Sequence, residues 1–294
     1  MSLIRKIVLY PFAILLNFVT SIRNLFFDLG IFKGYTFDYL SIGVGNISMG
    51  GTGKSVLVSY LADILNDKYM INILSRGYGR KSKGFQIASK SSNPNYLGDE
   101  PFMFYKQNPK VRVGVCNRRR EGMQRLIKSI NKNLKNIFIL DDVYQHRWVK
   151  PSIMILLTEY SKPYFKDYLF PSGNLRESRN SARRADLIIV TKCPSELPIE
   201  ERKKFISKLN IDLNQKVFFT KIKYDEHIFG KSKKLPLKIL KKVPFVLVTG
   251  IADNTLLVRE LKMRGLVFKT INYKDHFTYT KKNINKITSF SDGN

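Results

Sequence analysis

The feature that most constrains the fold is a glycine-rich segment, GNISMGGTGKS, at residues 45–55. A short apolar run at 39–45 precedes it and predicts a buried strand, while the apolar spacing of 54–65 predicts an amphipathic helix after it. Glycines between a strand and a helix let backbone N–H groups turn toward a phosphate, and the helix N-terminus adds its positive dipole. The segment therefore predicts ATP or GTP binding. The alternative is a glycine-rich connector without a ligand.

The residue types within this segment match the parts of a phosphate-binding loop. The ammonium group of Lys54 can reach the β- and γ-phosphates, and the hydroxyl group of Ser55 suits Mg²⁺. The strict pattern has glycine where this chain has Ser48. The predicted nucleotide-binding residues are Ser48, Met49, Gly50, Gly51, Thr52, Gly53, Lys54 and Ser55.

Short apolar runs without polar alternation continue beyond the loop, at 70–74, 111–116, 137–140, 153–157 and 187–190. Such runs are typical of parallel strands that are buried on both faces, and helical stretches lie between several of them. The predicted fold class is α/β, a P-loop NTPase-like parallel sheet with helices on both faces.

Three later runs predict a second, smaller α/β lobe. They lie at 216–220, 243–249 and 266–271. The expected organisation is an N-terminal helix within 1–38, a nucleotide-binding domain at 39–215 and the second lobe at 216–294.

Two adjacent acids, Asp141 and Asp142, end the predicted strand at 137–140. The carboxyl edge of a parallel sheet is where a nucleotide-bound Mg²⁺ needs an oxygen ligand. The pair is therefore predicted to be on the metal side of the nucleotide, together with Ser55. The alternative is an ordinary polar strand end.

Histidines are rare in this chain, so their positions are informative. His146 follows the acid pair, and His276 follows Asp275 after the last apolar run, whereas His227 is interpreted as a surface residue. Another acid pair, Asp99 and Glu100, begins a predicted helix. Those two acids could serve chemistry or simply stabilise the helix N-terminus.

The N-terminal segment predicts a helix with a broad apolar face. Within 7–19, 11 of 13 residues are apolar, which is too short a run to cross a bilayer core of roughly 20 apolar residues. Four polar residues then recur at helical spacing and form a narrow stripe: Asn17, Ser21, Asn24 and Asp28. With basic flanks, such a helix can lie in a membrane interface, or it can pack its wide face on the protein's own core.

The net charge of +28, from 51 Lys and Arg against 23 Asp and Glu, favours polyanionic partners such as nucleic acid, an anionic bilayer or a phosphorylated substrate. A genome bias toward Lys, Asn and Ile would explain the same charge without any partner. Two cysteines without a CxxC pair exclude a disulfide framework and suit a reducing compartment.

Taken together, these motifs resemble the lipid A 4′-kinase family, the tetraacyldisaccharide 4′-kinases. The motifs occur in the family's order: VGNISMGGTGKS at 44–55, ILSRGYGRKSKG at 73–84, GDEP at 98–101, DDVYQH at 141–146, FPSGNLRES at 170–178, ADLIIVTK at 185–192 and DHF at 275–277. The resemblance spans most of the chain, and a hydroxyl residue is common in the family at position 48. The family usually continues further, which leaves open whether this is a short member or one with an incomplete second lobe.

The resemblance implies transfer of phosphate from ATP, with Mg²⁺, to the 4′-hydroxyl of lipid A disaccharide 1-phosphate. It implies that Asp99 is the general base with His276 as its partner, and that 39–215 is the kinase domain. Lys54, Ser55, Asp141 and Asp142 match nucleotide and metal positions, and Arg76, His146, Glu177 and Asp275 match further active-site positions.

The resemblance also implies a location. The N-terminal helix would hold the protein on the cytoplasmic face of the inner membrane, in a peripheral or shallowly inserted position, and no nucleic acid partner is expected. The rival hypothesis is a nucleotide-binding ATPase or switch that acts on nucleic acid or another polyanion. The sequence contains no interleaved aromatic–basic stacking motif of the kind that single-strand binders use, and no NKxD-like motif follows the acid pair. Both absences argue against the rival hypothesis.

Overall fold

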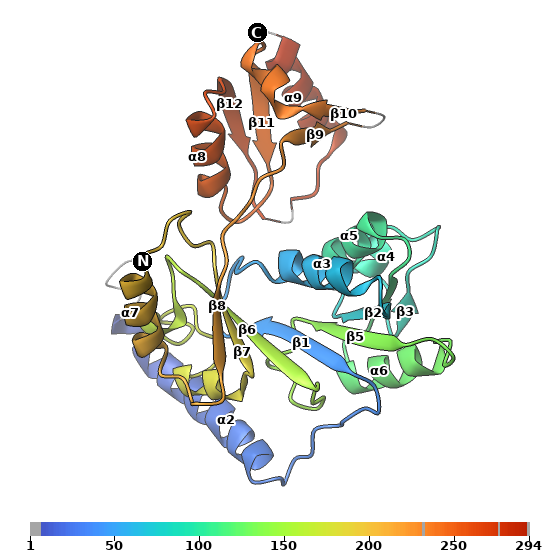
Figure 1. Ribbon diagram of the computed structural model, residues 1–294, viewed down its shortest axis with the longest axis vertical. Helices are drawn as coiled ribbons and strands as arrows, with labels where there is room; N and C mark the ends of the chain where they lie inside the picture. The colour runs from blue at the N-terminus through green and yellow to red at the C-terminus, as the bar shows by residue number, and fades with distance from the viewer. Residues whose placement is uncertain (1–6, 231–232, 276, 293–294) are drawn as a thin grey trace. The chain divides into compact units, whose positions relative to one another are not determined.

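The computed structural model describes residues 7–230, 233–275 and 277–292. The chain forms two compact units, Met1–Ile222 and Lys223–Asn294 (Figure 1). The first unit is built on one large sheet, and the second on smaller two-stranded sheets.

The large sheet contains eight strands in the order β3-β4-β2-β5-β1-β6-β7-β8. All neighbours pair in parallel except β3 with β4, so the prediction of a mainly parallel sheet is confirmed. The strands are β1 (Ser41–Asn46), β2 (Met70–Ser75), β3 (Gln86–Ile87), β4 (Arg112–Val115), β5 (Asn136–Asp141), β6 (Ile153–Glu159), β7 (Leu187–Thr191) and β8 (Lys216–Phe219).

Helices cover both faces of this sheet because successive apolar side chains of each strand point to opposite sides. On one face, Ile71 and Ile73 of β2 pack in a core with Val58 of α3 and Phe104 of α5. Residues of α6 and α7 lie in cores on the other face. The helices are α3 (Lys54–Leu65), α4 (Pro94–Leu97), α5 (Asp99–Gln107), α6 (Arg119–Lys128) and α7 (Ile199–Leu209), with 3₁₀ turns η1 (Tyr164–Lys166) and η2 (Arg179–Arg184).

The parallel pairing gathers polar residues at one edge of the sheet. Asn46, Ser75, Asp141 and Thr191 are the last residues of β1, β2, β5 and β7. Strand β1 lies between β5 and β6, so the glycine-rich loop emerges beside the acid pair. This edge is the expected place for a ligand in an open α/β sheet.

The N-terminal helix α2 (Tyr10–Asp28) exposes its apolar face. Phe12, Leu15 and Phe18 are 60%, 61% and 63% exposed, and the buried residues of the helix are Ala13 and Phe27. The interpretation that the wide apolar face packs on the protein's own core is therefore wrong for this unit. Part of the polar stripe makes those contacts instead.

The second unit has a small core formed by Leu237, Leu261 and Leu266. Its parallel strands β11 (Phe245–Thr249) and β12 (Phe268–Asn272) correspond to two of the runs expected in this lobe. The other elements are β9 (His227–Phe229), β10 (Lys234–Pro236), η3 (Leu237–Lys241), α8 (Thr255–Met263) and α9 (Lys281–Asp292).

The strand expected at 216–220 is present, but it belongs to the first unit and not to the second lobe. It is β8, and its hydrogen bonds to β7 make it the edge strand of the large sheet. The division between the two compact units therefore follows Ile222, rather than residue 215.

Candidate active site

The glycine-rich loop has the backbone shape of a phosphate cradle. Gly50 and Gly53 have φ angles of +109° and +90°, a region that favours glycine, and Gly53 is the N-cap of α3. A Cβ atom added to Gly50 or Gly51 would contact nothing within 4 Å. The loop thus leaves room for a ligand at the N-terminus of a twelve-residue helix.

Asn46, which the sequence analysis did not select, holds this loop in shape. The residue is fully buried, and its Nδ2 donates hydrogen bonds to Ser48 O at 2.6 Å and Thr52 Oγ1 at 2.9 Å. Its Oδ1 accepts a hydrogen bond from Lys54 Nζ at 3.2 Å. From the far side, Thr191 Oγ1 donates to Thr52 O at 2.9 Å. The loop is therefore ordered by its own side chains and by the end of β7.

Lys54 lies beside the second acid of the pair. Its Nζ is 3.5 Å from Asp142 Oδ1, and Arg176 Nη1 is 3.2 Å from Asp142 Oδ2. Burial alone would raise the pKa of Asp142, but the positive charges of Lys54 and Arg176 outweigh it, so this pKa lies below its ordinary value. Asp142 is therefore an ionised carboxylate at neutral pH.

Asp141 has the opposite environment. It is 3% exposed, and its Oδ2 accepts a hydrogen bond from Ser75 Oγ at 2.8 Å. Burial, followed by the negative charge of Glu100, raises the pKa of Asp141 to about 6. Burial makes the ionised form of this carboxylate unfavourable, and a bound cation would stabilise that form.

Hard oxygen donors gather near this carboxylate. Ser55 Oγ donates to Glu100 Oε1 at 3.2 Å, and Glu100 is close enough to Asp141 to influence its pKa. Among the described residues, no group of three or more His, Cys, Asp or Glu is placed to hold a metal by itself. Mg²⁺ does not need such a cage, because it usually takes one or two carboxylates together with substrate phosphates and water. The donor set fits that mode of binding.

Arg119 supplies a buried positive charge behind the acid pair, and the sequence analysis did not identify it. Its guanidinium donates to Cys116 O at 2.7 Å and to Asp141 O at 3.1 Å. Burial lowers the pKa of Arg119 to about 10, so it stays protonated. Burial, together with Arg119 and Arg76, lowers the pKa of His146 to about 4. His146 is therefore a neutral imidazole at physiological pH.

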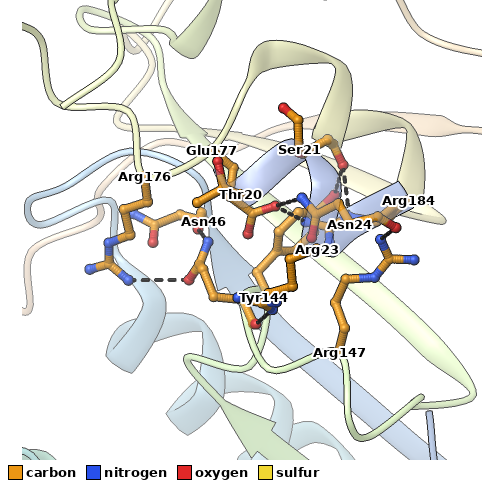
Figure 2. A network of polar contacts seen from close by, with 12 residues as sticks. Thr20, Ser21, Arg23, Asn24, Asn46, Tyr144, Arg147, Arg176, Glu177 and Arg184 are labelled. Atoms are coloured by element: carbon orange, nitrogen blue, oxygen red, sulfur yellow. Dashed lines mark hydrogen bonds and ion pairs between the residues drawn. The ribbon is translucent and has the colours of Figure 1, made fainter. Parts of the chain in front are cut away.

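The structure places the remaining predicted residues in different surroundings. Asp99 is exposed as the first residue of α5, and Gly98 rather than Asp99 occupies the N-cap position. Glu177 is buried beside α2, where it accepts hydrogen bonds from Asn24 and Arg184 (Figure 2). Asp275 belongs to the second unit, and His276 lies outside the described residues.

Replacing Asp141 by asparagine should stabilise the metal-free protein. The folded-state pKa of about 6 lies above the ordinary 3.8, so the unfolded chain releases the proton first as pH rises. The gain should therefore be small near pH 4, grow up to about pH 6, and reach at most about 3 kcal/mol above it. Chemical denaturation in EDTA at several pH values measures this difference.

The same substitution should remove Mg²⁺-dependent activity while stability rises, because Mg²⁺ sites rely on the negative charge of one or two carboxylates, which a neutral amide lacks. An Asp141→Asn protein that is less stable than the wild type at pH 7 in EDTA would contradict the assigned environment. An unchanged Mg²⁺ titration would place the metal elsewhere.

Comparison of the sequence with known proteins identifies relatives that are kinases, in agreement with a nucleotide-binding site. Residues 5–294 match the family described as Tetraacyldisaccharide-1-P 4′-kinase. The tetraacyldisaccharide 4′-kinase of Flavobacterium johnsoniae is 43% identical to this chain, over 100% of this chain and 85% of its own length. That of Flavobacterium psychrophilum is 44% identical, over 98% of this chain and 83% of its own length. The tetraacyldisaccharide 4′-kinase of Bacteroides thetaiotaomicron is 35% identical over 95% of this chain and 76% of its own.

A solved structure shares the fold. The crystal structure of LpxK from Aquifex aeolicus in complex with ATP has a TM-score of 0.76 and 30% sequence identity, and the match covers 97% of this chain and 91% of that chain. These matches cover 95% or more of the chain and so include residues of both units. The chain therefore belongs to the tetraacyldisaccharide-1-phosphate 4′-kinase family.

Proposed function

We propose that this protein transfers the γ-phosphate of ATP to the 4′-hydroxyl of lipid A disaccharide 1-phosphate. The observation that carries the proposal is an intact phosphate loop, held by Asn46 and paired through Lys54 with Asp142, in a chain of this kinase family. A neighbouring fold that has been solved with ATP supports ATP as the donor.

The residues of the loop and the acid pair would bind and orient the nucleotide. The N–H groups of the glycine-rich loop and the ammonium of Lys54 would bind the phosphates and neutralise their negative charge. Ser55, Asp141 and Asp142 are the residues we assign to Mg²⁺, with Glu100 beside Ser55. Bound Mg²⁺ would supply charge neutralisation on the phosphates. Arg76 is assigned to the nucleotide side of the site.

The remaining assignments concern the acceptor hydroxyl. Phosphoryl transfer depends on alignment and electrostatic stabilisation more than on covalent catalysis. Asp99 would orient the sugar hydroxyl and take its proton, since a carboxylate next to a weakly acidic hydroxyl serves this purpose late in the reaction. His276 and Asp275 would assist Asp99. His146 would act as a neutral hydrogen-bonding group near Asp142, because its pKa of about 4 keeps it uncharged.

Helix α2 supports a location at a membrane surface. The apolar run at 7–19 alone is too short to cross a bilayer core, but the whole helix, Tyr10–Asp28, is long and apolar enough by length and composition. The 18-residue window that meets this test has a mean hydropathy of 1.2, and 6% of that window is buried. A core helix of a soluble domain would be mostly buried, so that explanation does not fit. An exposed apolar face beside a chain of net charge +28 suits an anionic lipid surface. We place this surface at the cytoplasmic face of the inner membrane, where ATP is available.

Removing apolar side chains from the outer face of α2 should release the protein from anionic vesicles. The test pair is Leu15→Asp with Phe18→Asp. The matched control is Ile199→Asp with Leu213→Asp, which adds the same two negative charges at exposed apolar positions outside α2. Co-sedimentation with phosphatidylglycerol vesicles measures binding. The wild type should weaken in high salt without full release, because the apolar contribution is not screened. Equal release of both double variants would contradict a specific role for α2.

The activity itself is tested with γ-labelled ATP and lipid A disaccharide 1-phosphate in detergent. Label in the lipid at the 4′ position supports the kinase. Hydrolysis of ATP that DNA or RNA stimulates, with no label in the lipid, would instead support the rival ATPase hypothesis, which the family match does not favour.

A further inference from the structure

Glu177 connects the N-terminal helix with the body of the first unit. It is 4% exposed, and its Oε2 accepts a hydrogen bond from Asn24 Nδ2 of α2 at 3.0 Å and from Arg184 Nη2 of η2 at 2.6 Å (Figure 2). Its Oε1 is buried and has no hydrogen-bond partner among the described residues. Asn24 therefore supplies one of the two side-chain hydrogen bonds to Oε2 of this buried carboxylate, and buried charges depend strongly on such partners.

The segment just before Glu177 is bonded to the phosphate loop. Arg176 N donates to Ile47 O at 2.7 Å, and Met49 N donates to Asn174 O at 2.7 Å. These two bonds enclose an antiparallel bridge between Ser48 and Leu175. The position of Glu177 and the path of residues 47–49 are therefore fixed together by the backbone. This is the first route from α2 to the loop.

A second hydrogen-bonded route runs through Gln145; it includes no hydrogen bond to Glu177, although the negative charge of Glu177 also acts on Arg23. Arg23 Nη2 of α2 donates to Gln145 O at 2.5 Å, and Gln145 Nε2 donates to Asn46 O at 2.8 Å. Asn46 is the buried residue whose side chain bonds Ser48, Thr52 and Lys54. Two neighbouring residues of α2 are thus linked by short hydrogen-bonded chains to both sides of the same loop.

Polar contacts make up much of the attachment of α2 to its unit. In addition to the side-chain bonds of Arg23 and Asn24, Arg147 donates to the backbone Asn24 O at 2.9 Å and forms an ion pair with Asp28 at 2.6 Å. Apolar burial in the described part of α2 is limited to Ala13 near its start and Phe27 near its end, where Phe27 packs on Trp148. The docking of α2 and the order of the phosphate loop therefore share one hydrogen-bond network.

We propose that Asn24 and Arg23 are positioning residues for ATP, acting through Glu177 and Gln145, so that nucleotide affinity depends on the docking of α2. This inference rests on the proposed function for the identity of the nucleotide. It assigns the polar face of α2 a task separate from the apolar face, namely to hold residues 46–49 in their binding geometry. Coupling between linked sites usually changes affinity by about 5- to 150-fold.

The test is nucleotide affinity without any lipid acceptor. Full-length protein bound to phosphatidylglycerol vesicles is titrated with a fluorescent ATP analogue and Mg²⁺. Asn24→Ala and Arg23→Met should each weaken binding by about 5- to 50-fold. The matched control is Ser21→Ala, because Ser21 is exposed on the same polar stripe and, among the described residues, its hydroxyl bonds only Asn17 within the helix. The control should bind the nucleotide like the wild type, and all variants should stay on the vesicles.

Thermal unfolding of the nucleotide-free proteins separates positioning from general damage. If Asn24→Ala fails to fold, Arg23→Met tests the second route by itself. Wild-type nucleotide affinity in the folded variants would overturn the inference, even if their melting temperatures fall. A loss of affinity in Ser21→Ala equal to theirs would overturn it as well. A kinase assay that fails in the wild type while the two variants still lose nucleotide affinity would count against the lipid substrate and not against this coupling.

Discussion

Replacing Lys54 by methionine should lower the rate of lipid phosphorylation by about 10²–10³-fold, the usual loss when a preorganised electrostatic contact to the reacting group is removed. Methionine keeps most of the aliphatic stem, and the side chain of Lys54 is only 13% exposed, so packing should survive. The missing ammonium is the group that would neutralise the phosphates. Initial rates with saturating lipid and varied Mg-ATP measure the effect.

The matched control is Lys132→Met, which removes the same charge from an exposed position away from the loop. It should phosphorylate lipid like the wild type. The ion pair of Asp142 with Arg176 should keep that carboxylate charged in the Lys54→Met protein. Normal turnover in a folded Lys54→Met protein would show that the phosphates bind elsewhere, and the assignment of the loop would be wrong.

The strands of the large sheet were predictable because burial on both faces leaves a simple trace in the sequence. Runs such as 137–140 contain no polar alternation, and the structure places their residues in cores on both sides of the sheet. Their carboxyl ends were equally predictable, since acids or small polar residues follow them. The prediction that Asp141 and Asp142 lie beside the phosphate loop is consistent with the ion pair between Asp142 and Lys54.

The orientation of α2 could not be read from its pattern. Helical periodicity shows that a helix has a polar and an apolar face, but it does not say which face meets the protein. The structure shows that Asn24 turns inward to Glu177 while Phe12 and Leu15 point outward. An inward polar face needs partners far away in the sequence, and such pairings leave no local signal.

The same reason explains the site residues that the sequence analysis missed. Asn46 lies inside a recognised motif, but its importance follows from a contact with Thr52 that only the fold creates. Glu100 was noted as half of an acid pair, but its contact with Ser55 was not predictable from the sequence. Arg119 is one arginine in a run of three, and burial alone distinguishes it from its neighbours. The assignment of 216–220 to the second lobe was wrong for a related reason, because a strand's sequence does not specify its sheet.

Replacing Asp99 by asparagine should lower kcat far more than it changes ATP affinity. An amide keeps the shape of the side chain but cannot take the proton of the sugar hydroxyl, and a general base typically contributes 10²–10⁴-fold. Asp99 is exposed at the start of α5 and does not cap it, so the fold should tolerate the change. Steady-state rates with saturating lipid and Mg-ATP measure kcat, and a fluorescent nucleotide measures affinity.

A double-mutant cycle with His276→Ala tests whether the two residues act as one unit. If His276 assists Asp99, its loss alone should cost less than the loss of Asp99, and it should cost little more once Asp99 has been replaced. Asp67→Asn, an exposed acid elsewhere, serves as the charge-matched control. Fully additive losses would mean that the two residues contribute independently. If the Asp99→Asn enzyme is active, Asp99 is not the general base and another group must take the proton. Asp99 would then be an acid that is favourably placed in the first turn of a helix.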